Sequence, residues 1–188
     1  MTGVFVPVVG PSGAGKDTLI AAARDSLGAD SRFLFVRRTV TRAEGGNEDH
    51  DTIDAAGFAA CRRDGAYVLS WGAHGLYYGI PVSALEATRR GRVVVANLSR
   101  GVLTDARAAF PAVRIVNVTA PPAVLASRLA GRGRETRAEI ETRLARRSPV
   151  AVSGPDVLTV ENAGALDEAV ERLTHLLLRL AETIAAPQ

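Results

Sequence analysis

The sequence predicts an α/β fold with three layers, in which helices cover both faces of a mainly parallel sheet. Short apolar runs alternate with stretches of helical periodicity, as is typical of strand–helix–strand units. The chain of 188 residues has the length of one compact domain. Its 47% hydrophobic and 23% charged residues suit a globular protein and exclude a disordered one. No apolar run reaches the ~18 residues of a membrane span, so no membrane association is expected.

The first predicted strand is Val4 to Val9, a nearly continuous apolar run of the kind found in strands buried on both faces. Apolar residues then recur at helical spacing from Lys16 to Leu27, and Gly28 follows as a stop. The stretch between them, Gly10 to Gly15, is too rich in glycine for regular structure. The chain therefore opens with a strand, a glycine-rich loop and a helix.

The same two patterns continue to the C-terminus. Short apolar runs predict further strands at residues 33–36, 93–96, 113–118 and 157–160. Helices are predicted at 81–90, at 101–109, from Pro122, from a capping box of Thr136 and Glu139 to about Arg147, and over 166–184. The final helix carries Leu166, Val170, Leu173, Leu177, Leu180 and Ile184 on one face. In such a fold, ligands bind at the carboxyl ends of the strands.

Two segments interrupt this alternation. Residues 37–80 contain a short helix near 57–64 and are otherwise too polar and glycine-rich for the central sheet. Residues 128–147 hold seven arginines against three glutamates. We predict one domain, 1–188, in which the first segment is a small acceptor-binding insertion and the second a lid.

The opening loop, GPSGAGK, matches the phosphate-binding pattern G-x-x-x-x-G-K after a strand and before a helix. In this context backbone N–H groups and the helix N-terminus surround a polyphosphate. ATP is the expected nucleotide, with Mg²⁺. The predicted nucleotide-binding residues are Gly10, Pro11, Ser12, Gly13, Ala14, Gly15, Lys16, Asp17 and Thr18.

Lys16 is the strongest single argument for this loop. Of the 23 basic residues, 22 are arginine and Lys16 is the only lysine. Arginine richness reflects base composition, whereas a compact ammonium is needed between the β and γ phosphates. The alternative, a glycine-rich turn without a ligand, does not explain this lysine.

Asp17 stands where the pattern has a serine or threonine, whose oxygen ordinarily ligates magnesium. We hypothesise that the Asp17 carboxylate binds Mg²⁺ directly or through water. Thr18 is the alternative source of a hydroxyl, for an α-phosphate.

The predicted lid contains Arg132 and Arg134 in the glycine-flanked turn GRGR, and Arg143 on the capped helix. A turn of this kind is able to swing, and its arginines would close over phosphates. We predict that Arg132 and Arg143 are catalytic, together with Lys16. The alternative is a solvated basic helix paired with Glu139 and Glu141.

A second basic segment supplies candidates for an acceptor that already carries phosphate. It contains Arg38 and Arg42 and is followed by Glu48 and His50. Arginine forks match phosphate oxygens, and carboxylates accept hydrogen bonds from sugar hydroxyls. Tyr78, before a glycine, is a candidate hydrogen-bond donor to phosphate. The alternative role of such residues is a solvated surface or a pocket wall.

Several other properties narrow the class of protein. Cys61 is the only cysteine, which excludes an internal disulfide and favours a reducing compartment, so the cytoplasm is expected. The arginines are spread along the chain without interleaved aromatic residues, so no nucleic-acid partner is expected. No feature indicates an oligomeric state.

As a set, GPSGAGK, the T-x-T-R of Thr39 to Arg42, YYG at Tyr77 to Gly79, and RLAGRG followed by Arg143 resemble the guanylate-kinase branch of the P-loop kinases. The resemblance covers nearly the whole chain. It implies a P-loop kinase core with a lid and an acceptor region. It also implies that Arg132 and Arg143 contact the transferred phosphate, and that Arg42 and Tyr78 contact the acceptor's phosphate.

The departures from guanylate kinases are specific. Ser70 stands where they carry the glutamate that reads guanine, and His50 stands where they carry a tyrosine. Asn97 ends a predicted strand where they carry an acidic residue, for which the Asp17 carboxylate would compensate. GPSGAGKD, VTR, EDHD, LSW-x-A-H-G-L-YYG and ANLSR together resemble a narrower family, the ribose 1,5-bisphosphate phosphokinases of phosphonate breakdown. This resemblance implies ATP-dependent phosphorylation of ribose 1,5-bisphosphate to 5-phosphoribosyl 1-diphosphate.

The substrate-binding candidates are accordingly Arg38, Arg42, Glu48, His50, Ser70, Tyr78 and Asn97. The alternatives are a guanylate-kinase-like nucleoside monophosphate kinase and a non-catalytic guanylate-kinase-like binding module.

Overall fold

The structure is a computed structural model, and it describes residues 2–42, 50–131 and 152–185. A parallel five-stranded sheet forms its centre, in the order β2-β7-β1-β8-β9. The strands are β1 (Val4–Val9), β2 (Phe33–Phe35), β7 (Val93–Asn97), β8 (Ile115–Thr119) and β9 (Val157–Glu161). The predicted α/β class with a mainly parallel sheet is confirmed.

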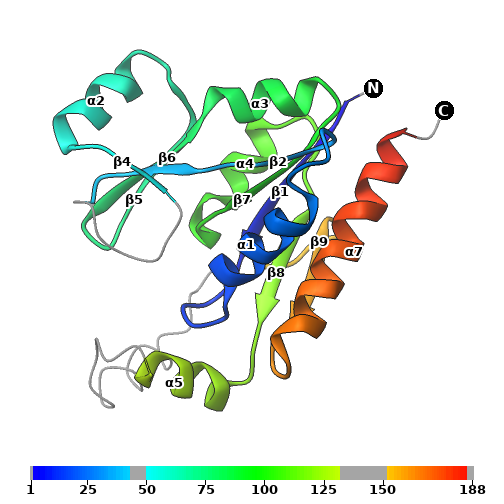
Figure 1. Cartoon of the computed structure of the whole chain (residues 1–188). Helices are drawn as coiled ribbons and strands as arrows, with labels where there is room; N and C mark the ends of the chain where they lie inside the picture. The colour runs from blue at the N-terminus through cyan, green and yellow to red at the C-terminus, as the bar shows by residue number, and fades with distance from the viewer. Residues whose placement is uncertain (1, 43–49, 132–151, 186–188) are drawn as a thin grey trace.

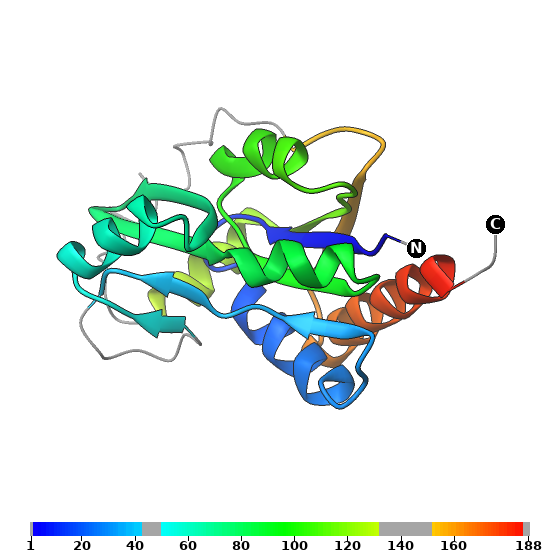
Figure 2. The same ribbon diagram turned by 90° about the horizontal axis from the view of Figure 1, so that it is seen from above.

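Helices cover both faces of this sheet, so the fold has three layers (Figures 1 and 2). One face carries α1 (Lys16–Leu27) and α7 (Leu166–Ala185). The other carries α3 (Val82–Arg89) and α4 (Leu103–Ala109), which follows a single 3₁₀ turn, η1 (Arg100–Val102). The helix α5 (Pro122–Ala130) follows β8 at the carboxyl ends of the strands (Figure 1).

Alternation along β1 divides the core into two clusters. Val6 and Val8 belong to the cluster with Leu19 of α1 and Leu173 of α7. Phe5 and Val9 belong to the opposite cluster, where the Phe5 ring stacks on Phe110 with centroids 3.8 Å apart. Every residue of β1 is buried, as the apolar run predicts.

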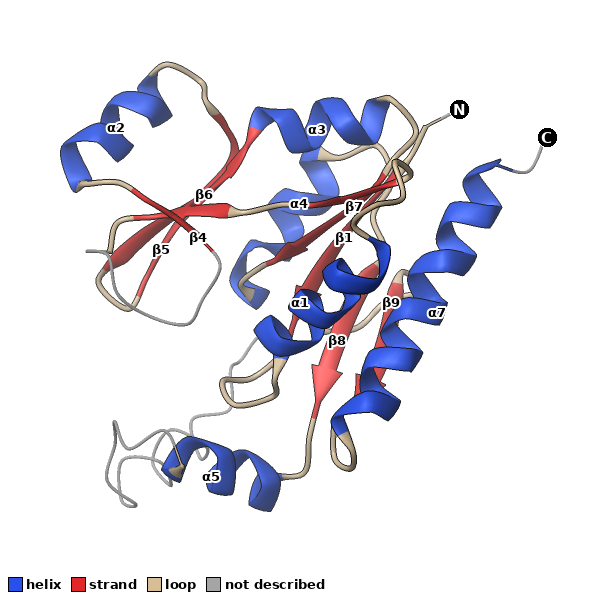
Figure 3. Cartoon of the chain, in the orientation of Figure 1, coloured by secondary structure: helices blue, strands red, loops and turns tan. Residues whose placement is uncertain are grey.

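A second, smaller sheet lies to one side of the first (Figure 3), in the order β4-β3-β6-β5. Its strands are β3 (Arg38–Val40), β4 (His50–Thr52), β5 (Tyr67–Ala73) and β6 (Leu76–Pro81), and α2 (Ala55–Arg63) packs beside it. These residues fall almost wholly within the segment 37–80, and the part of this segment that the structure describes contributes nothing to the central sheet. The organisation of the chain as one domain with an acceptor-binding insertion and a lid remains a prediction.

The turn between β5 and β6 does not have the residues that usually mark a two-residue β-hairpin loop in a sequence. His74 and Gly75 form a two-residue loop with φ of 54° and 74°, while Ala73 pairs with Leu76. Histidine rarely adopts a positive φ, so the turn has no familiar Asn-Gly or Asp-Gly signal.

The helix predicted from Thr136 to about Arg147 lies outside the described residues. None of the helices within the described ranges has the length and apolar character to cross a membrane.

Candidate functional site

The phosphate-binding loop lies at the carboxyl end of β1, where it turns into α1. Gly10 has a φ of 149°, and a Cβ there would overlap the carbonyl oxygen of Val118. Gly15 has a φ of 87°, and a Cβ there would lie 2.5 Å from Nδ2 of Asn162. Both positions therefore require glycine for conformation and for space. The result is a tight loop whose backbone could approach a bound ligand closely.

Lys16 lies over this loop. Its Nζ donates to the carbonyl oxygens of Gly10 and Pro11, each at 3.0 Å. The ammonium is thus held at the space enclosed by the loop, where the helix N-terminus adds a partial positive charge. This arrangement suits the tail of a nucleoside triphosphate.

The loop is supported from beneath by the chain after β9. Asn162 is 1% exposed, and its Nδ2 donates to the carbonyl oxygen of Ala14 at 2.8 Å. Arg128 of α5 donates to the carbonyl oxygen of Asn162 at 2.9 Å. The buried amide therefore fixes the loop to two other elements at the carboxyl edge of the sheet.

Asp17 is the first link between the loop and the rest of the site. Its Oδ1 accepts a hydrogen bond of 2.5 Å from Nδ2 of Asn97, at the end of β7. The same oxygen lies 4.0 Å from the guanidinium of Arg38, on β3. Arg38 is 14% exposed in its side chain and Asp17 is 41% exposed. The loop, the central sheet and the second sheet thus meet at one carboxylate.

The second sheet presents an aromatic wall to this meeting point. Trp71 of β5 stacks on Tyr78 of β6, with ring centroids 5.3 Å apart. The Arg38 guanidinium lies over the Tyr78 ring, 5.4 Å from its centroid. Stacking holds the Arg38 guanidinium beside the loop without neutralising its charge.

These residues enclose a hollow of about 600 Å³. Its lining includes most of the predicted site, namely Gly10, Ser12, Gly13, Gly15, Lys16, Asp17, Thr18, Arg38, Arg42, Tyr78 and Asn97. The remaining lining residues are Trp71, Ala73, His74, Leu98, Ser99, Arg100 and Gly101. The polar character of this wall fits anionic ligands.

Some predicted residues do not line the hollow. Pro11 and Ala14 contribute carbonyl oxygens that bind Lys16 and Asn162. Ser70 pairs with Gly79 across the second sheet, and His50 is 9% exposed. Among the described residues, Nδ1 of the His50 ring has no hydrogen-bond partner. The backbone carbonyl oxygen of His50 accepts a hydrogen bond of 3.1 Å from the Arg37 guanidinium.

Glu48, Arg132 and Arg143 lie outside the described residues. The roles predicted for them, and for the other site residues, remain predictions. Arg100 is the charged lining residue that the sequence analysis does not assign. Its sequence signal is its place: it lies three residues after the end of β7, at the edge where ligands bind.

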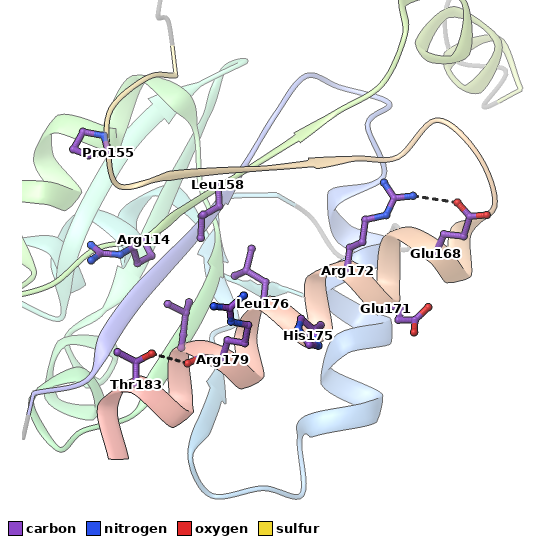
Figure 4. A pocket seen from close by; sticks show the side chains of 11 residues that line it. Arg114, Pro155, Leu158, Glu168, Glu171, Arg172, His175, Leu176, Arg179 and Thr183 are labelled. Carbon is purple, nitrogen blue, oxygen red and sulfur yellow. Dashed lines mark hydrogen bonds and ion pairs between the residues drawn. The ribbon is translucent and has the colours of Figure 1, made fainter. Parts of the chain in front are cut away.

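Figure 4 shows a second hollow, of about 760 Å³, between α7 and the edge strand β9. Some of its polar side chains form hydrogen bonds within α7 itself. Arg172 donates to Glu168 at 3.1 Å, and the Thr183 hydroxyl donates to the Arg179 carbonyl oxygen at 2.9 Å. It is larger than the first hollow but has no glycine-rich loop, so we place the functional site at the loop.

Two solved structures show the same fold. The chain superposes on a guanylate kinase from Anaplasma phagocytophilum with a TM-score of 0.64 and 16% identity, covering 95% of this chain and 86% of the other. A gluconokinase from Sinorhizobium meliloti gives a TM-score of 0.54 and 21% identity, covering 97% and 95%. At these identities the likeness concerns the fold alone.

Curated relatives are much more similar in sequence. A "Ribose 1,5-bisphosphate phosphokinase PhnN" from Brucella melitensis is 47% identical, covering 97% of this chain and 96% of the relative. One of the same name from Methylobacterium radiotolerans is 48% identical, covering 94% and 98%. A "Bifunctional ribose 1,5-bisphosphokinase-thymidine phosphorylase" from Cupriavidus pinatubonensis is 44% identical over the full chain, which spans 31% of it. No family model matches the chain.

Proposed function

The chain belongs to the family of PhnN ribose 1,5-bisphosphate phosphokinases, and from this membership we propose that it transfers the γ-phosphoryl group of ATP to ribose 1,5-bisphosphate. The products are ADP and 5-phosphoribosyl 1-diphosphate. The family assignment favours this function over a nucleoside monophosphate kinase or a binding module, as the sequence analysis predicts.

The atom balance identifies the accepting group. The product carries its diphosphate on carbon 1, so the accepting oxygen belongs to the 1-phosphate and not to the 5-phosphate. That oxygen forms a bond to the γ-phosphorus of ATP, while the bond from this phosphorus to the β–γ bridging oxygen breaks. A sugar phosphate is largely ionised near neutral pH, so no general base is needed.

The observation that carries the proposal is the meeting of Asp17 and Arg38, 4.0 Å apart, in one hollow. Asp17 follows the loop lysine, and Arg38 belongs to the second sheet. A polyphosphate held by the loop and a phosphate held by Arg38 would therefore approach each other. Positioning of this kind, with positive charge around the transferring group, is the main requirement for phosphoryl transfer.

The roles that we propose follow from this geometry. Lys16 and the loop N–H groups bind the polyphosphate, and Arg38, Arg42 and Tyr78 bind the accepting phosphate. Arg132 and Arg143 are proposed, from the family resemblance alone, to stabilise charge on the transferring group.

The residues present fit a magnesium ion. Around the loop they offer hard oxygen donors, namely the Asp17 carboxylate, the Thr18 hydroxyl and the Asn97 amide oxygen. Within the described residues no cluster of three or more His, Cys, Asp or Glu forms a metal cage. Magnesium in nucleotide sites is typically held by one or two protein oxygens together with phosphates and water. Bound there, Mg²⁺ would neutralise phosphate charge, and we propose Asp17 as its main protein ligand.

Purified protein offered γ-labelled ATP and a panel of acceptors tests the proposed function. We expect the label in the terminal phosphate of 5-phosphoribosyl 1-diphosphate. Phosphorus NMR distinguishes this product because the 5-phosphate remains a monoester. GMP should accept no label, because Ser70 stands at the place of the guanine-reading glutamate of the guanylate kinases and does not line the hollow. Efficient transfer to GMP, or a product with a 5-diphosphate, would refute the proposal.

A further inference from the structure

Arg100 is a charged residue of the hollow to which the proposed function gives no role. The backbone around it is anchored on both sides. Leu98 donates its N–H to the carbonyl oxygen of Val8 at 3.1 Å, and Val102 and Leu103 are 4% and 3% exposed. Arg100 therefore begins η1 at a fixed place on the wall formed by the end of β7.

The environment of Arg100 differs from that of the paired arginines. Arg107 donates to Asp156 at 2.8 Å, and Arg32 donates to Asp30 at 2.6 Å. Over residues 2–42, 50–131 and 152–185, by contrast, no carboxylate pairs with Arg100. Burial lowers the pKa of the Arg100 guanidinium, and no carboxylate of the described residues opposes this effect. A partly buried cation without a partner costs free energy, which an anionic ligand in the hollow would recover.

The proposed acceptor has two phosphates that need separate places. The 1-phosphate must lie beside the loop, because it receives the phosphoryl group there. Arg38 lies at that place, 4.0 Å from Asp17. The 5-phosphate is attached on the other side of the ribose ring, so it cannot share this place. Arg100 belongs to neither the loop nor the second sheet and supplies positive charge on a third wall of the same hollow.

We propose that Arg100 binds the non-reacting 5-phosphate and thereby selects the bisphosphate over ribose 1-phosphate. This inference rests on the proposed function, because it takes the identity of the acceptor from it. Arg100 is a specificity residue in this account, since its guanidinium contacts a group at which no bond changes. Its planar fork suits two phosphate oxygens at once.

Arg100→Met tests the inference by binding as well as by turnover. Trp71 is the only tryptophan and lines the same hollow, so its fluorescence reports ligand titrations. We expect the variant to bind ribose 1,5-bisphosphate about 30-fold more weakly, as for a lost charge-assisted hydrogen bond, and to bind ribose 1-phosphate with unchanged affinity. Arg100→Lys, which keeps the charge without the fork, should give an intermediate loss.

Arg63→Met is the matched control, because the Arg63 side chain is 75% exposed and lies outside the hollow. It should leave both affinities unchanged, and thermal melting checks that every variant folds. Calorimetry repeats the titrations without relying on fluorescence. In kinetics, the loss in Arg100→Met should appear in kcat/KM for the bisphosphate and not for ribose 1-phosphate.

Equal losses for both ligands, no loss for either, or a wild-type protein that does not prefer the bisphosphate would each overturn the inference. The binding data separate this inference from the proposed function. If the wild-type protein binds the bisphosphate through Arg100 but forms no labelled product, the inference stands and the proposed function fails.

Discussion

Lys16→Met should lower turnover by on the order of 10³-fold or more while leaving the protein folded. Lys16 places its ammonium over the loop, with hydrogen bonds of 3.0 Å to the carbonyl oxygens of Gly10 and Pro11. Charge at this point stabilises the phosphates most when negative charge moves to the leaving oxygen. Steady-state kinetics with saturating ATP and ribose 1,5-bisphosphate measures the effect on kcat, and melting curves check the fold.

Lys16→Arg is the informative companion variant. It keeps the charge but replaces a compact ammonium with a larger planar group. The Lys16 ammonium fits between the carbonyl oxygens of Gly10 and Pro11, each at 3.0 Å, and the larger planar group cannot take the same position. We therefore expect Lys16→Arg to recover little of the lost activity. A Lys16→Met variant with near-normal turnover would show that the loop does not hold the reacting phosphates.

Asp17→Ala should lower kcat/KM by on the order of 10²-fold and raise the magnesium concentration needed for turnover. The reason is that the Asp17 carboxylate is the acidic group of the loop, and Asn97 beside it carries no charge. Calorimetric titration of ATP at several magnesium concentrations gives a readout besides activity. The variant should show weaker ATP binding at low magnesium, and the difference should shrink as magnesium rises.

Asp17→Ser supplies the matched variant for this measurement, because it restores the hydroxyl that phosphate-binding loops usually carry at this position. It should recover part of the magnesium response. An Asp17→Ala variant with the magnesium dependence of the wild-type protein would contradict the metal role. Asp17 would then act mainly through Asn97 and Arg38.

The central sheet could be predicted because its signals are local. The ranges Val4 to Val9 and Lys16 to Leu27 agree with β1 and α1 in the structure. An apolar run buried on both faces and a helix with one apolar face each carry their pattern within a few residues. The other strands of this sheet differ from their predicted ranges by one or two residues at their ends.

The strands of the second sheet were not predicted, because they depend on distant partners. Thr39 pairs with Gly79, some forty residues along the chain. Two of them, β3 and β4, are polar segments of three residues without a clear alternation, and pairing with distant strands stabilises them instead. The alternation of side chains along β5 also explains why Ser70, a predicted site residue, does not line the hollow. Trp71 and Ala73 line the hollow, whereas Ser70 between Leu69 and Trp71 belongs to the opposite face of β5.

In the site, too, the residues with a local sequence pattern could be predicted and those that depend on distant contacts could not. The loop and Lys16 could be identified from seven consecutive letters, and Arg38, Arg42, Tyr78 and Asn97 join them in the hollow. The support from Asn162 to Ala14 spans 148 residues, so no local pattern reveals it. Arg100 belongs to the motif ANLSR but receives no role from the sequence, because arginine is abundant in this chain. Its burial, and the absence of a paired carboxylate among the described residues, distinguish it in the structure.

A crystal structure with a non-hydrolysable ATP analogue, magnesium and ribose 1,5-bisphosphate would test the central claim most directly. We expect the polyphosphate in the loop under Lys16, with the 1-phosphate beside Arg38 in line with the γ-phosphate. Electron density for the sugar bisphosphate outside this hollow, or for the polyphosphate away from the loop, would contradict the account.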